Sequence, residues 1–269
     1  MTILFAAGWR ESKNSPWDMP HRISGMDESG AFWKSLKEKI KRCRGGKQAK
    51  QRVTVTFFVN AAGEKEPLIV IGTSKTPRCF RKFRDQSRPA GCYYFANSKA
   101  WIQSELILQI LNTRMKNAGR NIIRFLDNAP SHPRELINMF SNIKVAFRPK
   151  NTTSRTQCLH AGVIKNWKVK FRKKLLQYVC SQTGRTNVHK KANDIVKSID
   201  LLKAIRWMEQ AWQEVDPLTI VKCWSKVGIN CSDEGCEEDD DPFAGEELLT
   251  LERLLNQVQD PTNEGPATD

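Results

Sequence analysis

The sequence predicts an α/β protein built around one mixed β-sheet. A hairpin pattern stands in the first third of the chain, where RVTVTFFVN is followed by a turn around Gly63 and then by PLIVIG. From Ser98 onward, helical and strand-like stretches alternate, and such alternation implies crossover connections between parallel strands. We therefore expect an antiparallel hairpin and later parallel strands in the same sheet.

Two further stretches extend the first part of this sheet. HRISGMDESG, residues 21–30, is a candidate short strand that carries Asp27, and CYYFA, residues 92–96, is a candidate third strand. The strongly basic connector between residues 34 and 52 contains two adjacent glycines, which favours a loop.

The second half alternates between helix and strand. Apolar residues recur at helical spacing over residues 98–117, and NIIRFLD is typical of a buried strand that ends at Asp127. RELINMFSN then predicts a short helix and IKVAF another strand. The following stretch, QCLHAGVIKNWKVKFRKK, predicts a helix at residues 157–174 with six Lys/Arg and no acid.

The C-terminal part predicts helices and then a polar tail. Residues 194–215 place apolar side chains on one broad face, and Asp216 followed by Pro217 is an N-cap signal for another helix. Residues 232–247 are too acidic to form a core, whereas 246–259 carry a leucine stripe suited to docking or pairing.

These patterns divide the chain into four expected parts. Residues 1–20 form an irregular lead-in, 21–182 the α/β domain, 183–230 a helical extension packed on it, and 231–269 an acidic, largely disordered tail with a short amphipathic helix near 246–258.

Charge is segregated along the chain. Residues 1–230 contain 43 Lys/Arg and 16 acids, whereas residues 231–269 contain 1 and 13. A globular part this basic suits a polyanion, most commonly nucleic acid. The acidic tail could compete with that polyanion or recruit basic or chromatin proteins, although plain solubilisation explains it equally well.

The remaining composition excludes several classes. The eight cysteines lack C-x-x-C pairs and zinc-finger spacing, so we expect reduced thiols in an intracellular protein. No apolar run is long enough to cross a bilayer, and no membrane partner is expected.

Two acidic residues stand at the ends of predicted strands. Asp27 and Asp127 are both placed at the ends of predicted strands, where ligands bind in open α/β sheets and two carboxylates can hold a hard cation such as Mg²⁺. An Asx turn or a helix cap explains either residue on spacing alone.

Several motifs in the same order carry a family resemblance. MDESGAFWK, the segment from Lys47 to Phe80, FLDNAPSHP, and RPKNTTSRTQCLHAGVIKNWKVKFRKKLL resemble the DDE endonuclease domain of Tigger and pogo-type transposases. Domesticated relatives of that family include centromere protein B and the jerky proteins. The resemblance runs from about Met26 to Ile229 and implies an RNase H-like fold, with helices on both faces of the sheet.

The resemblance also implies a catalytic triad. Its first acid falls on Asp27 and its second on Asp127, while the third position, an Asp in the family, is His160 here. Because Mg²⁺ prefers anionic oxygens, a neutral imidazole weakens a two-metal site, and we expect DDE-type cutting to be absent or weak. Mn²⁺ accepts imidazole more readily, so residual cutting with Mn²⁺ stays open, and Glu28 is the nearest candidate for a replacement ligand.

The basic residues are expected to meet phosphates. The expected nucleic-acid contacts are Lys47, Lys50, Arg52, Lys165, Lys168, Lys170, Arg172, Lys173 and Lys174. A third cluster of basic residues lies between Arg78 and Arg88. Each basic cluster can be explained either as a DNA contact or as a solvated loop. The connector could also be a nuclear import signal, and we expect a nuclear protein.

Three functions remain after this reasoning. The leading expectation is a transposase-derived DNA-binding protein with impaired catalysis; the others are an active metal-dependent DNA endonuclease and a non-catalytic chromatin or protein-interaction factor. Only about two dozen residues precede Asp27, too few for the helix-turn-helix modules of such transposases, so sequence-specific recognition is not expected.

Overall fold

The computed structural model describes residues 20–35, 51–81, 91–98, 121–127, 132, 134–141, 143–148, 156–183, 192–229 and 246–259. The predicted helix over 98–117, most of the connector over 34–52 and most of the acidic tail lie outside these residues.

The centre of the fold is a six-stranded mixed sheet. Its strands are β1 (Ile23–Phe32), β2 (Arg52–Asn60), β3 (Ile69–Gly72), β4 (Tyr93–Ala96), β5 (Ile122–Leu126) and β6 (Ile143–Phe147), in the spatial order β4-β3-β2-β1-β5-β6. β1, β2 and β3 are antiparallel, whereas β5 runs parallel to β1 and β6 parallel to β5. The predicted α/β class, with a hairpin and later parallel strands in one RNase H-like sheet, is confirmed.

β1 differs from its prediction in length. It spans ten residues and pairs with β2 from Ser24 opposite Asn60 to Phe32 opposite Arg52. Asp27 therefore lies in the middle of a strand, and its predicted place at a strand end is wrong. The Asp, Ser and Gly of MDESG are typical of turns, but pairing with the β-branched residues of β2 overrides that local preference.

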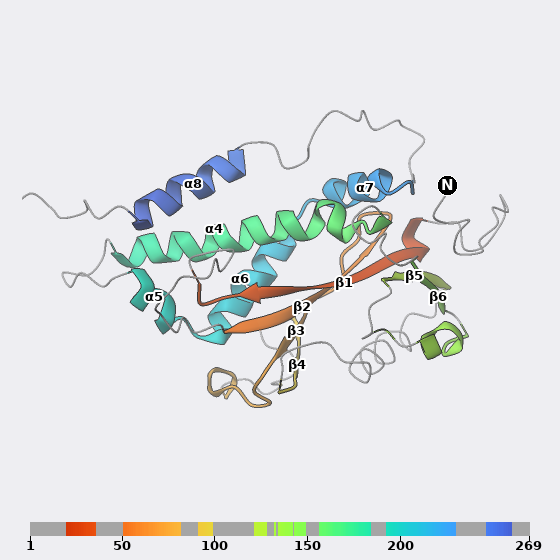
Figure 1. Ribbon diagram of the computed structural model, residues 1–269, viewed down its shortest axis with the longest axis horizontal. Coiled ribbons are helices and arrows are strands. Elements are labelled where there is room, and N and C mark those ends of the chain that lie inside the picture. Colours follow the sequence, from red (N-terminus) through yellow and green to blue (C-terminus); the bar gives the residue numbers. More distant parts are fainter. Residues whose placement is uncertain are drawn as a thin grey trace, which may run out of the picture.

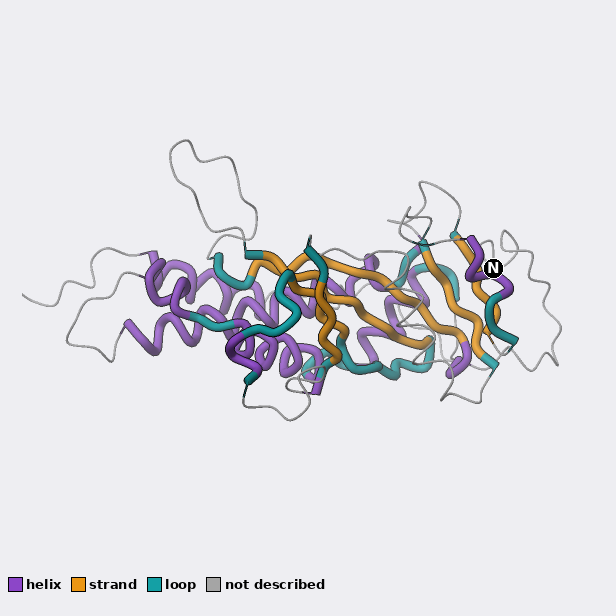
Figure 2. The backbone as a smooth tube through the Cα atoms, turned by 90° about the horizontal axis from the view of Figure 1, so that it is seen from below, coloured by secondary structure: helices purple, strands orange, loops and turns teal. Residues whose placement is uncertain are grey.

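Helices cover one face of the sheet. A kinked π-helical turn, η5 (Leu159–Val163), leads into α4 (Ile164–Thr183), which is followed by α5 (Ala192–Ser198), α6 (Leu201–Gln213) and α7 (Pro217–Lys226). Figure 1 shows α4 running alongside β1, with α8 (Glu246–Gln259) on its outer side. Figure 2 shows the same arrangement from below, as an elongated molecule with helices at one end and strands from its middle towards the other end.

The main core lies between the sheet and these helices. Trp167 of α4 is fully buried, and its ring meets Phe57 of β2 edge-on at 4.8 Å and stacks on Phe171 at 5.6 Å. Trp212 of α6 meets the same Phe57 at 5.2 Å. A smaller core on the opposite face joins Met26 to Leu126 and Leu136, the last from the 3₁₀ helix η4 (Arg134–Asn138).

Caps divide the helical extension. The single helical region expected over 194–215 is two helices, because the Asp200 side chain accepts a hydrogen bond from the Lys203 amide at 2.7 Å and begins α6. The predicted start of α7 is confirmed, since Asp216 accepts from the Leu218 amide at 2.8 Å and Pro217 occupies the first turn.

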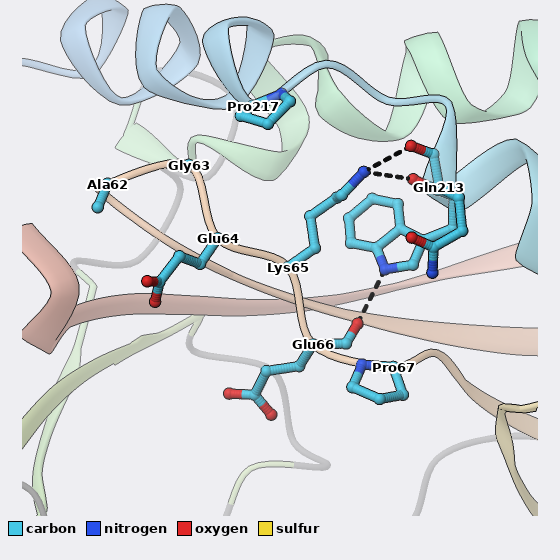
Figure 3. Close-up of a pocket in the computed structure, with 9 residues that line it drawn as sticks. Ala62, Gly63, Glu64, Lys65, Glu66, Pro67, Gln213 and Pro217 are labelled. Carbon is cyan, nitrogen blue, oxygen red and sulfur yellow. Dashed lines mark hydrogen bonds between the residues drawn. The ribbon is translucent and has the colours of Figure 1, made fainter.

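The turn between β2 and β3 holds the end of α6. The Lys65 amino group donates to the carbonyls of Trp212, Gln213 and Val215 at 2.9, 2.9 and 2.6 Å. Figure 3 shows this lysine pointing at the C-terminal end of the helix. Gly63, at φ +88°, lies so close to α7 that a Cβ there would stand 2.8 Å from the Pro217 carbonyl. We call Lys65 and these three carbonyls the lysine cap.

α8 belongs to the same packed unit. Leu251 is buried in the main core, and Leu255 and Val258 are half-buried against it. The Cys180 thiol of α4 lies 3.9 Å from the Leu254 carbonyl. Leu248 is exposed, so the expected leucine stripe is buried only in part. Among the described helices, none is long and apolar enough to span a membrane.

Candidate functional site

Asp27 meets the third predicted site residue directly. Its carboxylate is almost completely buried, and the Oδ2 atom lies 3.0 Å from Nε2 of His160. The turn that carries His160 is held on β1 because the Gln157 side-chain amide donates to the Met26 carbonyl at 3.4 Å. The sequence therefore brings the first and third positions together as an ion pair.

Asp127 directly follows the end of β5, the strand that pairs with the first part of β1. Gly25 of β1 is in register with Phe125 of β5, and Asp27 and Asp127 are each two residues further along these parallel strands. Both carboxylates act electrostatically on His160. Contact with Asp27 is the main reason that the pKa of His160 is raised above its ordinary value, while partial burial opposes the rise. We call Asp27, Asp127 and their neighbours the acid edge.

His132 is a site residue that the sequence reasoning missed. Its Nδ1 atom lies 2.7 Å from Asp127 Oδ1, and its Nε2 atom lies 3.7 Å from Glu28 Oε2. Burial disfavours the charged imidazole, but the close contacts with the two negatively charged acids outweigh it and raise the pKa of His132 to about 10. The one available signal was its position in the sequence, five residues after Asp127.

Glu28 occupies the face of β1 opposite Asp27, as strand alternation requires. It nevertheless takes part in the acid edge, because His132 joins its carboxylate to Asp127. Burial raises the pKa of Glu28 above its ordinary value, with His132 opposing the rise.

Arg148, the second residue missed, follows β6 directly. Its amide donates to the Leu126 carbonyl at 2.9 Å, which places it beside the end of β5. The side chain is almost fully buried, and the guanidinium lies 5.4 Å from the centre of the Phe125 ring. Burial lowers the pKa of Arg148, while Cys158, Asp27 and Asp127 oppose that change, so the two carboxylates of the acid edge are among its charged neighbours.

The acid edge does not fit a divalent metal site as it stands. Among the described residues, no group of three or more His, Cys, Asp and Glu side chains has the geometry to hold a metal ion. Asp27 faces His160, and Asp127 faces His132, so each family acid already has a cationic or imidazole neighbour. Mg²⁺ requires several oxygen ligands in near-octahedral geometry, which this arrangement does not offer.

The predicted phosphate contacts have different environments. Lys165 is exposed, and Lys168, Lys170 and Lys173 are partly exposed on α4. Arg172 is buried and donates to the Ser35 carbonyl, and Lys174 pairs with Glu214 at 2.5 Å. Arg52 donates to Thr54 at 3.5 Å, and Lys47 and Lys50 lie outside the described residues.

A cavity of about 110 Å³ lies between β1 and α4. Its walls are Gly30, Ala31 and Phe32 of the strand and Trp167, Lys168, Phe171 and Arg172 of the helix. Lys168 also acts electrostatically on His160, so the cavity adjoins the acid edge. Beyond Gly25, no described strand pairs with β1 on the side of β5. We call this space the β1–α4 cavity.

The geometry can be compared with known proteins. A family model described as "DDE superfamily endonuclease" matches residues 50–224, more than half of the chain. The chain belongs to this family. The DDE domain is of the Tigger and pogo type, since the curated relatives that it matches include Tigger-derived and centromere proteins.

Three relatives illustrate the match. Tigger transposable element-derived protein 4 of Mus musculus is 31% identical over 219 residues, covering 78% of this chain and 40% of the relative. CENP-B homolog protein 2 of Schizosaccharomyces pombe is 30% identical, covering 78% and 42%. Major centromere autoantigen B of Homo sapiens is 26% identical, covering 82% and 37%. The chain thus spans about two fifths of the length of these relatives.

The solved structures that the chain resembles are more distant. The Mos1 strand transfer complex has a TM-score of 0.44 at 13% identity, covering 96% of this chain and 58% of that one. The Mos1 mariner paired end complex with Mn has a TM-score of 0.43 at 12% identity, covering 78% and 53%.

Proposed function

We propose that this chain is a transposase-derived DNA-binding domain whose strand-cutting activity is impaired. The observation that carries the proposal is the 3.0 Å contact between His160 and Asp27. In the two-metal mechanism that the family resemblance implies, carboxylates hold the divalent ions. Here the third position presents an imidazole, which lies against the first acid instead of adding a negative ligand.

The second acid supports the same proposal. His132, cationic at neutral pH because its pKa is about 10, contacts Asp127 and Glu28 together. A metal ion at Asp127 would have to compete with this buried cation for the carboxylate, and like charges at such a distance repel. Glu28, the nearest replacement ligand considered from the sequence, is therefore already engaged with His132.

DNA binding rests on charge and on the β1–α4 cavity. The described face of α4 offers Lys165, Lys168, Lys170 and Lys173 to solvent, and such side chains bind phosphates without reading sequence. In this proposal a DNA phosphate approaches the mouth of the cavity, whose otherwise apolar walls include Lys168 and Arg172. Lys168 at its wall supplies the cation that would meet this phosphate.

Among the relatives, one is called ARS-binding protein 1 and others are called centromere autoantigens, which is consistent with a role on chromosomal DNA and a nuclear location. Basic or chromatin proteins that bind the acidic tail are a further part of the proposal. The tail residues 231–245 lie outside the described residues, so this part depends on charge alone.

The binding experiment measures affinity for a short DNA duplex at several salt concentrations, by fluorescence anisotropy. Each phosphate contact contributes a slope of about 0.9 to the dependence of log K on log salt. We expect Lys168→Gln to weaken binding and to reduce this slope by about one contact. Lys197→Gln is the matched control, since Lys197 is an exposed lysine on α5 that pairs with Asp194 away from the cavity. Equal effects of both variants would contradict the role of the cavity.

The cutting experiment incubates supercoiled plasmid with Mg²⁺ or Mn²⁺. We expect little or no nicking by the wild-type chain. An active endonuclease is the second candidate, because Asp27, Asp127 and His160 do converge at one sheet edge. Robust nicking that Asp127→Ala abolishes would favour it and overturn the proposal of impaired cutting.

A further inference from the structure

Arg148 carries a buried guanidinium that is only partly hydrogen-bonded, and it has no carboxylate partner among the described residues. Only 3% of the residue is exposed, and its Nε and Nη1 atoms have no hydrogen-bond partner in the described structure. Buried polar groups are nearly always hydrogen-bonded, so each exception calls for an explanation. Arginine also stays charged inside proteins, because its intrinsic pKa is above 12, and it cannot escape this cost by losing a proton.

The surroundings of Arg148 give that explanation. Its backbone is tied to Leu126, the residue directly before Asp127, and the ring of Phe125 lies against the guanidinium. The groups that act on its charge are the carboxylates of Asp27 and Asp127 and the thiol of Cys158. Burial raises the pKa of that thiol far above its ordinary value, so the cysteine is neutral and the two carboxylates supply the stabilising charge.

Arg124, on the neighbouring strand β5, is a useful contrast. It is buried to 2% exposure, almost the same as Arg148. Its Nη2 atom contacts Glu66 at 3.3 Å, and its guanidinium lies 4.9 Å from the Phe58 ring. Both guanidiniums are only partly hydrogen-bonded. The difference between them is that Arg124 has a carboxylate partner of its own, whereas among the described residues Arg148 makes no ion pair with a carboxylate. What stabilises Arg148 is the combined field of the acid edge.

We infer that Arg148 is an internal counterion that takes the electrostatic place of a divalent ion at the acid edge. The position beside Asp27 and Asp127, reached from β6, holds a fixed positive charge that no change of pH removes. A divalent cation between the two aspartates would be repelled by this charge at short range and low dielectric. The inference deepens the proposed function and rests on it, since it assigns a third residue, after His160 and His132, to the loss of metal binding.

The inference changes what a single reversion should do. Restoring the family acid with His160→Asp adds a ligand, but the guanidinium remains beside the site. Metal binding should therefore increase further when the charge of Arg148 is removed as well. Without this role for Arg148, removing its charge would add nothing to the effect of His160→Asp.

The test titrates Mn²⁺ into the whole chain by calorimetry, with circular dichroism to verify folding. We expect His160→Asp combined with Arg148→Met to bind Mn²⁺ about 10-fold to 100-fold more tightly than His160→Asp alone, the range known for groups adjacent to a metal. Arg148→Lys in the same background keeps the charge and should leave the affinity at the level of His160→Asp.

Arg124→Met in the His160→Asp background is the matched control and should not change Mn²⁺ affinity. If the double variant that combines Arg148→Met with His160→Asp binds no more tightly than His160→Asp alone, the inference is overturned, as it is by an equal gain from Arg124→Met. If Arg148→Met fails to fold, Arg148→Gln removes the same charge while keeping a polar side chain, and the same outcomes decide. The proposed function fails separately, if the wild-type chain does not bind DNA or if it nicks plasmid.

Discussion

The lysine cap and the acid edge are two partly buried charged clusters with opposite hydrogen-bond status. In the lysine cap, Lys65 donates to three backbone carbonyls at 2.6 to 2.9 Å, and Trp212 beneath it donates to the Glu66 carbonyl at 2.8 Å. In the acid edge, Asp27 Oδ2, Glu28 Oε2 and His132 Nε2 lie within ion-pair reach of a neighbour but have no aligned hydrogen bond in the described structure.

This difference separates a cluster that stabilises the fold from one whose buried charges are only partly compensated. A satisfied lysine at the C-terminal end of a helix stabilises orphan carbonyls and the helix dipole. Poorly satisfied carboxylates crowded at a sheet edge destabilise a fold unless cations compensate them. The pocket lined by Lys65, shown in Figure 3, is consequently best understood as a structural junction rather than a ligand site.

The largest expected loss of stability lies beside the lysine cap, the cluster that supports the fold. Trp212→Ala should lower the free energy of unfolding by about 3–5 kcal/mol, because the ring is fully buried against Phe57 and its indole N–H is hydrogen-bonded. Urea denaturation measures the change. The exposed Leu218→Ala, on α7, is the control and should change stability by less than about 0.5 kcal/mol.

The next largest loss of stability is expected from a substitution in the acid edge. His132→Ala should cost about 3 kcal/mol, since it leaves Asp127 and Glu28 close together without the cation between them. The pKa of His132 rises on folding from 6.5 to about 10, so its stabilisation is complete below about pH 6.5 and is lost as the pH rises towards 10. Stability curves of wild type and variant should therefore converge between pH 7 and 10. A constant gap across that range would show that His132 acts by packing alone.

Lys65→Met should cost about 2 kcal/mol, because three carbonyls at the end of α6 lose their charged donor. Thermal unfolding followed by circular dichroism detects the change. Lys197→Met on α5 serves as the comparison and should behave like wild type. If Lys65→Met lowers the stability no more than Lys197→Met does, the lysine cap does not stabilise the fold.

The smallest effect concerns His160. Its side chain is 49% exposed, so solvent screens its pairing with Asp27, and His160→Ala should change stability by at most about 1 kcal/mol. Because the pKa of His160 is raised in the folded state, this small stabilisation is present at pH values below its ordinary pKa and disappears as the pH rises through the raised value. Urea titrations at pH 5.5 and 9 compare the two conditions. A loss that is larger at pH 9 would contradict the ion pair.

The sequence predicted the sheet well where local pattern and tertiary pairing agree. RVTVTFFVN and IKVAF became β2 and β6 with the expected limits, since β-branched and aromatic residues fit a buried pleat. The strand around Asp27 was underestimated because its polar and small residues gain their strand geometry only from β2. The break at Asp200 was missed for the reverse reason, since a capping aspartate within an apolar periodic pattern looks like one exposed position of a longer helix.

The acid edge was predicted only in part. Asp27, Asp127 and His160 came from motifs, and the register of β1 and β5 together with the 3.0 Å contact places them at one edge. His132 and Arg148 could not be found in the same way, because each lies in a connecting segment whose path depends on where neighbouring strands end. The alternating pattern of β1 did predict the face of Glu28, but not that an imidazole from another segment would reach it.

The docking of α8 has a practical consequence for expression work. Since Leu251 lies in the main core and Leu254 meets Cys180, a recombinant fragment that stops after α7 would leave an apolar surface of α4 in contact with water. Such a fragment should be less soluble than one that extends to Gln259. Sequence charge alone would have suggested the shorter boundary, at the start of the acidic stretch.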